Sequence, residues 1–186
     1  MASTAEFRNG LTIEVEGQLW TMIYFQHVKP GKGGAFVRTK LKNVRTGAVV
    51  ERTYRAGEKV NDVRLEHRPV TYSYSDGELY HFMDQQSFEL IPIAGEVIGE
   101  EQLKYLKENM ECEGLVYNES VISVELPTFV ELKIVQTDPG VRGDTAGGAT
   151  KPAKLETGAI VQVPLFVEEG DVVKVDRRED KYLTRV

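Results

Sequence analysis

Residues 27–43 read HVKPGKGGAFVRTKLKN, and this stretch decides the predicted fold. The first two residues of this stretch end a run of β-branched and aromatic side chains that begins at residue 19. Such a run is typical of a core strand. Proline fixes its own φ and glycine permits positive φ, so the PGKGG segment predicts a tight reversal of the chain. We therefore expect a β-hairpin. Its predicted tip comprises Lys29, Pro30, Gly31, Lys32, Gly33 and Gly34.

The strand that follows the tip alternates between two faces. Small and apolar residues occupy one face from Ala35 to Leu41, while Phe36 and three cations occupy the other. The cations are Arg38, Lys40 and Lys42. A row of cations suits nucleic-acid phosphates, which position a protein without reading sequence. The alternative for each cation is an ordinary solvated strand face.

Further strands and turns continue to the end of the chain. Turns are predicted at Thr46–Gly47, Ala56–Gly57, Asp76–Gly77 and Asn118. We expect an all-β fold of three small β-barrel domains in an elongated row. The expected domains are residues 1–65, 66–127 and 128–186.

Two segments are expected to depart from this strand pattern. Residues 99–110 place Leu103, Leu106 and Met110 at helical spacing, which predicts one helix. Residues 138–154 are rich in glycine and proline, which predicts a long loop.

Charge is distributed unevenly along the 186 residues, although the net charge is only -6. Residues 1–65 hold 11 Lys and Arg against 6 Asp and Glu, whereas residues 66–186 hold 12 against 23. This polarity indicates a protein that meets phosphates with one end. No apolar run is long enough to span a membrane and the N-terminus lacks signal-peptide features, so we expect a soluble cytoplasmic protein.

Enzyme and cofactor signatures are absent from the sequence. The three histidines, His27, His67 and His81, have no metal-ligand spacing with one another or with Cys112. No phosphate-binding loop precedes a helix, and no serine sits in a nucleophile elbow. The sequence thus predicts a protein that is not an enzyme and needs no metal or cofactor.

Lys32 has two interpretations. Lysine at an exposed turn is common, and a solvated tip explains it. However, three glycines around one lysine exceed what a turn needs. A lysine on a slender arm suits a narrow polyanionic channel, and it also suits recognition by a modifying enzyme.

Three parts of the chain resemble the bacterial translation elongation factor P family. The first is the tip and its following strand, residues 29–43. The second is YHFMD at 80–84 together with residues 106–132. The third is GDTAGGATKPAKLETGAIVQVPLFVEEGD at 143–171. The resemblance covers the full length of the chain.

The resemblance implies a fold and a function. It implies an SH3-like domain of the KOW type followed by two OB folds, in a tRNA-like L shape. It implies binding to the 70S ribosome between the P and E sites, beside a peptidyl-tRNA stalled on consecutive prolines. Lys32 would point toward the peptidyl-transferase centre, and a lysine-modifying enzyme would extend it in many members.

The resemblance also assigns residues of the third domain. Gly143, Asp144 and Thr145 match the loop that the family places near the E-site codon of the mRNA. Lys151 and Lys154 are candidate rRNA contacts, with solvation as the alternative. One departure lies at 176–182, where DRREDKY carries Asp180 at the position of the family's turn glycine.

Other readings and properties follow from the same residues. The alternatives are an elongation factor P-like paralogue and a general OB-fold binder of single-stranded RNA, which needs aromatics along a basic groove. Rhamnosylation is disfavoured because the tip residue is Lys32 and not the arginine that one branch of the family carries for glycosylation. For Lys32, β-lysylation, aminopentanolylation and no modification stay open. A dimer would obstruct a tRNA-shaped site, so we expect a monomer.

Overall fold

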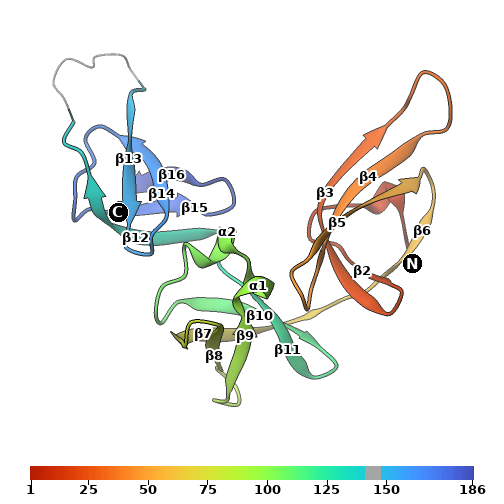
Figure 1. Ribbon diagram of the computed structural model, residues 1–186, viewed down its shortest axis with the longest axis horizontal. Coiled ribbons are helices and arrows are strands. Elements are labelled where there is room, and N and C mark those ends of the chain that lie inside the picture. Colours follow the sequence, from red (N-terminus) through yellow and green to blue (C-terminus); the bar gives the residue numbers. More distant parts are fainter. Residues whose placement is uncertain (141–147) are drawn as a thin grey trace.

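The computed structural model of the chain describes residues 1–140 and 148–186. Strands dominate it, and they form three sheets that follow one another along the chain (Figure 1). This confirms the predicted all-β, multi-domain fold. The parts that hold the three sheets are called the first, middle and third units below, with 65/66 and 127/128 as the proposed boundaries.

The first unit holds six strands in the order β1-β6-β2-β3-β4-β5. Their bounds are β1 (Ala2–Ser3), β2 (Thr12–Val15), β3 (Gln18–Val28), β4 (Phe36–Asn43), β5 (Val49–Arg55) and β6 (Lys59–Asp62), with a 3₁₀ helix η1 (Thr4–Glu6) after β1. Alternate side chains point inward as the pleat requires, so that Ile13, Met22 and Val37 are fully buried.

The middle unit holds five strands in the order β11-β10-β7-β8-β9. They are β7 (Glu66–Ser75), β8 (Leu79–Asp84), β9 (Leu90–Ala94), β10 (Glu111–Tyr117) and β11 (Ser120–Glu125). The turn predicted at Asp76 is present, because its carboxylate accepts the backbone N–H groups of Glu78 and Leu79. Asn118 begins the predicted second turn, and both Asn118 and Glu119 have positive φ.

The helix predicted over residues 99–110 is wrong. The structure has two short helices, α1 (Gly95–Ile98) and α2 (Glu100–Leu103), and the chain leaves α2 through 3₁₀-type turns. The reason lies in the tertiary packing: Tyr105 and Leu106 are neighbours in sequence, and both are buried. Their backbone N–H groups bond to the carbonyls of Gln102 and Leu103, three residues back, so tighter turns replace the α-helix while both side chains enter the core.

The third unit is a closed barrel in the order β12-β13-β14-β16-β15. Its strands are β12 (Phe129–Thr137), β13 (Thr150–Leu155), β14 (Ile160–Pro164), β15 (Val172–Asp176) and β16 (Lys181–Arg185). The predicted loop over 138–154 is therefore too long at its C-terminal end. Residues 150–155 alternate between exposed and buried side chains and pair with β14, which outweighs their loop-like composition.

The middle and third units share one hydrophobic core, which runs from Val70 to Val175, whereas the core of the first unit is a separate cluster. Figure 1 shows the resulting shape, with the first and third units as two limbs and the middle unit at the corner. This is the bent, elongated outline expected for the chain.

Asp180 adds a polar contact between the middle and third units. Its φ is 54°, so it keeps the left-handed backbone that suits the turn glycine expected here from the resemblance. Its carboxylate accepts hydrogen bonds from the Tyr105 hydroxyl at 2.6 Å and the Lys104 amine at 2.8 Å. Burial raises the pKa of Asp180, but the two donors outweigh burial and hold this pKa below its usual value. Burial and the same contact raise the pKa of Tyr105.

Asp180→Asn is expected to lower the free energy of unfolding at neutral pH by about 1 kcal/mol, because the carboxylate is half-exposed and its ion pair is screened. Asparagine tolerates the same backbone. The folded pKa lies below the unfolded value of about 3.9, so the contribution is complete above that pH and is lost as the pH falls through the folded pKa. Urea titrations of both proteins at neutral pH and about pH 3 measure the difference, which should narrow in acid. An equal difference at both pH values would rule out the ion pair.

Candidate nucleic-acid interface

An arm projects from the first unit, formed by β3, β4 and the tip between them, residues 29–35 (Figure 1). The two strands pair from Trp20↔Asn43 to Val28↔Phe36, and β5 pairs with β4 as far as Phe36↔Arg55. The paired part of the arm therefore has three strands, which stiffen it, and only the tip stands beyond them.

All six residues that were predicted to form the tip are exposed, from Lys29 to Gly34. Gly33 adopts the left-handed backbone that glycine permits, with φ 102°, whereas Gly31 and Gly34 do not. One left-handed residue is enough to reverse the chain between β3 and β4. A Cβ added at Gly31 or Gly34 would meet no described atom within 4 Å, so these two glycines leave open space around Lys32.

Arg38 and Lys40 lie exposed on the outer face of the arm, as predicted. The Lys40 amine lies 5.7 Å from the centre of the Tyr24 ring, and the Arg38 guanidinium lies 5.5 Å from the centre of the Phe36 ring. These cation–π contacts orient both side chains on the face. A hollow of about 320 Å³ runs between them, and its lining comprises Tyr24, Gln26, Arg38, Thr39, Lys40, Glu51 and Thr53.

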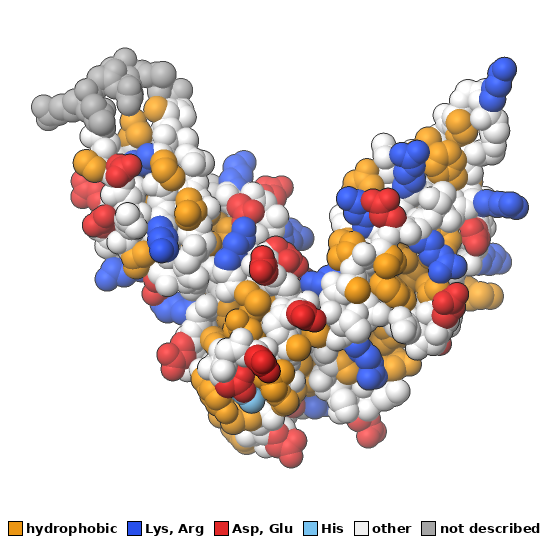
Figure 2. All heavy atoms as spheres, viewed as in Figure 1, with side chains coloured by type: hydrophobic (Ala, Val, Ile, Leu, Met, Phe, Trp, Pro, Cys, Tyr) orange, Lys and Arg blue, Asp and Glu red, His pale blue; other side chains and the backbone are white. Residues whose placement is uncertain are grey.

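Arg55 joins this face, although the sequence pattern did not single it out. It is exposed at the end of β5, directly opposite Phe36 in the register. The face of Arg38, Lys40 and Arg55 is called the basic face below, and Figure 2 shows Lys and Arg side chains gathered on this limb. Only the pairing of β5 with β4 reveals that Arg55 neighbours the cations of β4, because Arg55 and Phe36 lie on different strands, far apart in the sequence.

Lys42 does not belong to the basic face, contrary to the prediction from its alternation. Its amine donates to the Ile98 carbonyl and to the Glu101 carboxylate, both at 3.2 Å, and the side chain is only 20% exposed. It faces the middle unit, so it has no free amine for a phosphate. Its partners lie 56 and 59 residues away in sequence, beyond any local pattern.

The predicted residues of the third unit have different fates. Gly143, Asp144 and Thr145 lie outside the described residues. Lys151 is 6% exposed, and its amine donates to the Asp138 carbonyl, so its burial rules it out as an rRNA contact. Lys154 is exposed on β13 and keeps that candidate role.

Other kinds of site find no support in the part of the chain that the structure describes. Within residues 1–140 and 148–186, no three His, Cys, Asp or Glu side chains gather as a metal site requires. No helix in the same residues has the length and apolarity for a membrane crossing. Cys112 is buried, and burial raises the pKa of its thiol to about 12, which makes it a poor nucleophile.

Family comparisons cover nearly the whole chain. A model described as the elongation factor P (EF-P) KOW-like domain matches residues 3–60, the EF-P OB domain matches 65–124, and the elongation factor P C-terminal model matches 130–185.

Similar proteins carry the same description. The chain is 58% identical over 185 residues to elongation factor P of Moorella thermoacetica and 55% identical over 185 residues to that of Acaryochloris marina, with both chains fully covered. Among solved structures, the eukaryotic translation initiation factor 5A from Methanococcus jannaschii matches at 20% identity with a TM-score of 0.47, over 68% of this chain and 90% of that one.

Proposed function

The chain belongs to the elongation factor P family, and we propose that it binds the ribosome between the P and E sites and promotes peptide-bond formation at consecutive prolines. Family membership makes it a translation factor that acts with the ribosome. The location of binding and the relief of stalling are the finer part of the proposal. The exposed Lys32 at the end of a three-stranded arm is the observation that carries it.

The tip suits a narrow channel lined by RNA. Lys32 is flanked by glycines, so one long cation enters such a channel with no bulky side chain beside it. On the ribosome, this lysine extends along the acceptor end of the P-site tRNA toward the peptidyl-transferase centre. A modifying enzyme that lengthens Lys32 would have free access to it at the tip.

The basic face supplies the phosphate contacts. Arg38 and Lys40 were predicted for this role and the structure leaves both exposed, while Arg55 extends the same face. Such contacts fix register and orientation without reading sequence, which suits a factor that serves many tRNAs. Lys42 is left out of this set because it contacts the middle unit.

The third unit completes the proposed set of partners. We assign Gly143, Asp144 and Thr145 to the E-site codon of the mRNA, where small polar side chains hydrogen-bond exposed bases. We assign Lys154 to rRNA. The protein acts as a cytoplasmic monomer in this proposal, because a second copy on either limb would block a site shaped for a tRNA.

The chemistry needs no acid or base from the protein. Proline reacts slowly in peptide-bond formation chiefly because its ring constrains the attacking amine. A factor that restricts the peptidyl-tRNA to a reactive arrangement lowers the entropic part of the barrier. We therefore propose a positioning role without enzymatic turnover by this chain.

Toeprinting on a message with three consecutive prolines tests the proposal. Purified protein is added to ribosomes of its own source, with a known elongation factor P as the positive control. The stall signal should disappear in both. A stall that persists only with this protein would refute the proposed function.

A measurement of binding to naked RNA distinguishes the proposed function from the alternative of a general RNA binder. Such a binder would hold single-stranded RNA tightly without ribosomes, with a steep dependence on salt. Residues 66–186 carry 23 acidic against 12 basic side chains, which opposes this alternative.

A further inference from the structure

The first and middle units meet where the turn between β4 and β5 lies against α1. Gly47, in this turn, has φ 74°, and a Cβ added there would overlap the backbone carbonyl of Glu96. The turn itself is fixed, because the buried Asn43 side chain accepts the N–H groups of Arg45 and Thr46 at 2.9 and 3.0 Å. The two backbones therefore touch at a site where only glycine fits.

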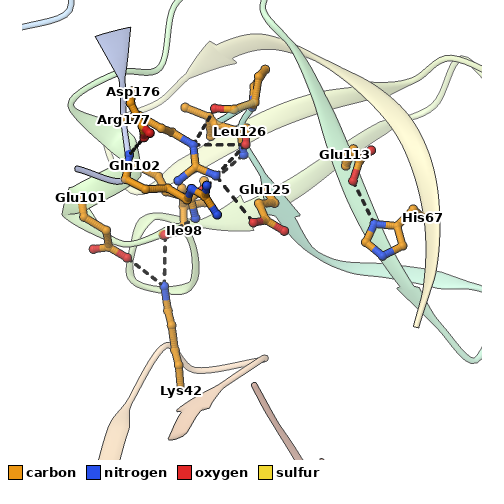
Figure 3. A network of polar contacts seen from close by, with 12 residues as sticks. Lys42, His67, Ile98, Glu101, Gln102, Glu113, Glu125, Leu126, Asp176 and Arg177 are labelled. Atoms are coloured by element: carbon orange, nitrogen blue, oxygen red, sulfur yellow. Dashed lines mark hydrogen bonds and ion pairs between the residues drawn. The ribbon is translucent and has the colours of Figure 1, made fainter. Parts of the chain in front are cut away.

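Lys42 fastens the same junction next to Gly47. Its amine donates to the Ile98 carbonyl, which also accepts a hydrogen bond from the Gln102 side chain at 3.0 Å (Figure 3). An ammonium held by a carbonyl and a carboxylate is a charge-assisted contact, stronger than a neutral one. Gly47 against Glu96 and Lys42 against Ile98 and Glu101 are together called the docking contact below.

The docking contact continues into the third unit. The Gln102 side-chain oxygen accepts the Leu126 N–H at 2.9 Å, and the Leu126 carbonyl accepts the buried Arg177 guanidinium at 2.7 Å. Figure 3 shows these side chains converging at one place. The Ile98 carbonyl, which accepts the Lys42 amine, is thus linked through hydrogen bonds of the middle unit to the third unit.

The remainder of the junction is loosely filled. A cavity of about 700 Å³ lies between the first and middle units, lined on one side by residues such as Thr12 and Ile23 and on the other by Leu115 and Ser123. The first unit has its own hydrophobic core, whereas the middle and third units share theirs. The angle of the first unit therefore depends on the docking contact and on the chain that crosses at residues 63–65.

We propose that Gly47 and Lys42 are positioning residues that set the angle of the first unit and so place Lys32 for the reaction. This inference rests on the proposed function. At ~3.3 Å per residue, about 20 Å of β4 separate Lys42 from Phe36, so a rotation of about 5° at the docking contact moves the end of the arm by roughly 2 Å. A displacement of this size costs a positioned reaction about a hundredfold in rate.

Gly47→Ala tests the proposal, with Gly57→Ala as its matched control. Both glycines have positive φ, at 74° and 84°, so both substitutions strain the backbone equally. The Cβ at Gly57 meets no described atom within 4 Å, whereas the one at Gly47 meets Glu96. Lys42→Met removes the amine with the backbone untouched, and Lys42→Arg restores a donor.

Two measurements read out these variants. Spin labels at Lys59→Cys and Glu131→Cys, both exposed, report the distance between the first and third units without ribosomes. Gly47→Ala and Lys42→Met should shift or broaden this distance, while Gly57→Ala and Lys42→Arg should match the parent. On ribosomes stalled at prolines, the maximal rate should fall by about tenfold or more at an unchanged half-maximal concentration.

The outcomes separate this inference from the proposed function. Unchanged distances in both Gly47→Ala and Lys42→Met overturn the inference, and so does a broadened distance with a normal maximal rate. If Gly47→Ala fails to fold, Lys42→Met decides alone. If the wild-type protein relieves no stall, the proposed function fails, and the assigned role in placing Lys32 fails with it even where the distances change.

Discussion

Replacing Lys32 by alanine is expected to abolish the relief of proline stalling while leaving the protein folded. Lys32 is the exposed cation at the very end of the arm, so its removal shortens the part of the factor that approaches the reacting groups. We expect the rate of peptide-bond formation in the presence of the factor to fall about a hundredfold, toward the rate without it. The free energy of unfolding should change by less than about 0.5 kcal/mol, as for other exposed sites.

Lys29→Ala is the control for this experiment. Lys29 lies in the same tip, carries the same charge and is also exposed. It lies at the base of the tip, directly after β3, so its loss should weaken binding slightly and leave the maximal rate close to that of the wild type. Equal losses in both variants would mean that only tip charge matters. Full activity of Lys32→Ala would remove Lys32 from the mechanism.

Arg177→Ala is expected to have the largest effect on stability, a loss of about 3 kcal/mol in the free energy of unfolding. The guanidinium is 7% exposed and donates to the carbonyls of Leu126 and Pro127, with the Glu125 carboxylate at 3.6 Å. Burial lowers the pKa of Arg177, and Glu125 partly offsets this effect. Truncation would leave the buried Leu126 carbonyl without its donor, which is costly.

Arg178→Ala is the matched control, because Arg178 is the next residue and is exposed. Its loss should stay within about 0.5 kcal/mol of the wild type. Arg177→Lys should fall between the two, since one ammonium cannot reproduce the fork of a guanidinium. Urea unfolding followed by circular dichroism measures all three, since the single tryptophan, Trp20, reports only on the first unit. Similar losses at both positions would show that the buried contacts contribute little.

Lys32→Ala and Arg177→Ala should also affect different properties of the protein. Lys32→Ala removes function at constant stability, and Arg177→Ala lowers stability first. The Arg177 carbonyl partner, Leu126, lies in the chain of hydrogen bonds that leads to Lys42. Arg177→Ala should therefore also broaden the distance between the first and third units, although less than Gly47→Ala does.

Local patterns in the sequence were sufficient for most strands. Burial alternates along β4 as expected, with Val37, Thr39 and Leu41 inside and Arg38 and Lys40 outside. The alternation is reliable because the pleat places neighbours on opposite faces whatever the rest of the fold does. The turn at Asp76 was equally local, since the side chain there bonds to backbone groups two and three residues on.

Where sequence reasoning failed, distant packing decided. Residues 99–110 had helical spacing, but α2 ends at Leu103, and Tyr105 beyond it is buried with its hydroxyl on Asp180, 75 residues away. Glycine permits a left-handed backbone at all three tip positions, yet only Gly33 adopts one, so the sequence did not show which glycine closes the turn. Lys151 was taken from a loop-like composition and lies buried in a barrel strand.

The sequence by itself determined the all-β class, the lysine-tipped hairpin and the alternation of the basic strand. Only the tertiary structure decided which of its equivalent cations are exposed: Arg38 and Lys40 face solvent, while Lys42 fastens the first unit to the middle one. The pleat is a property of each strand and is written in neighbouring residues. Contacts between units join residues far apart in the sequence, so their identity depends on how separately folded surfaces fit together.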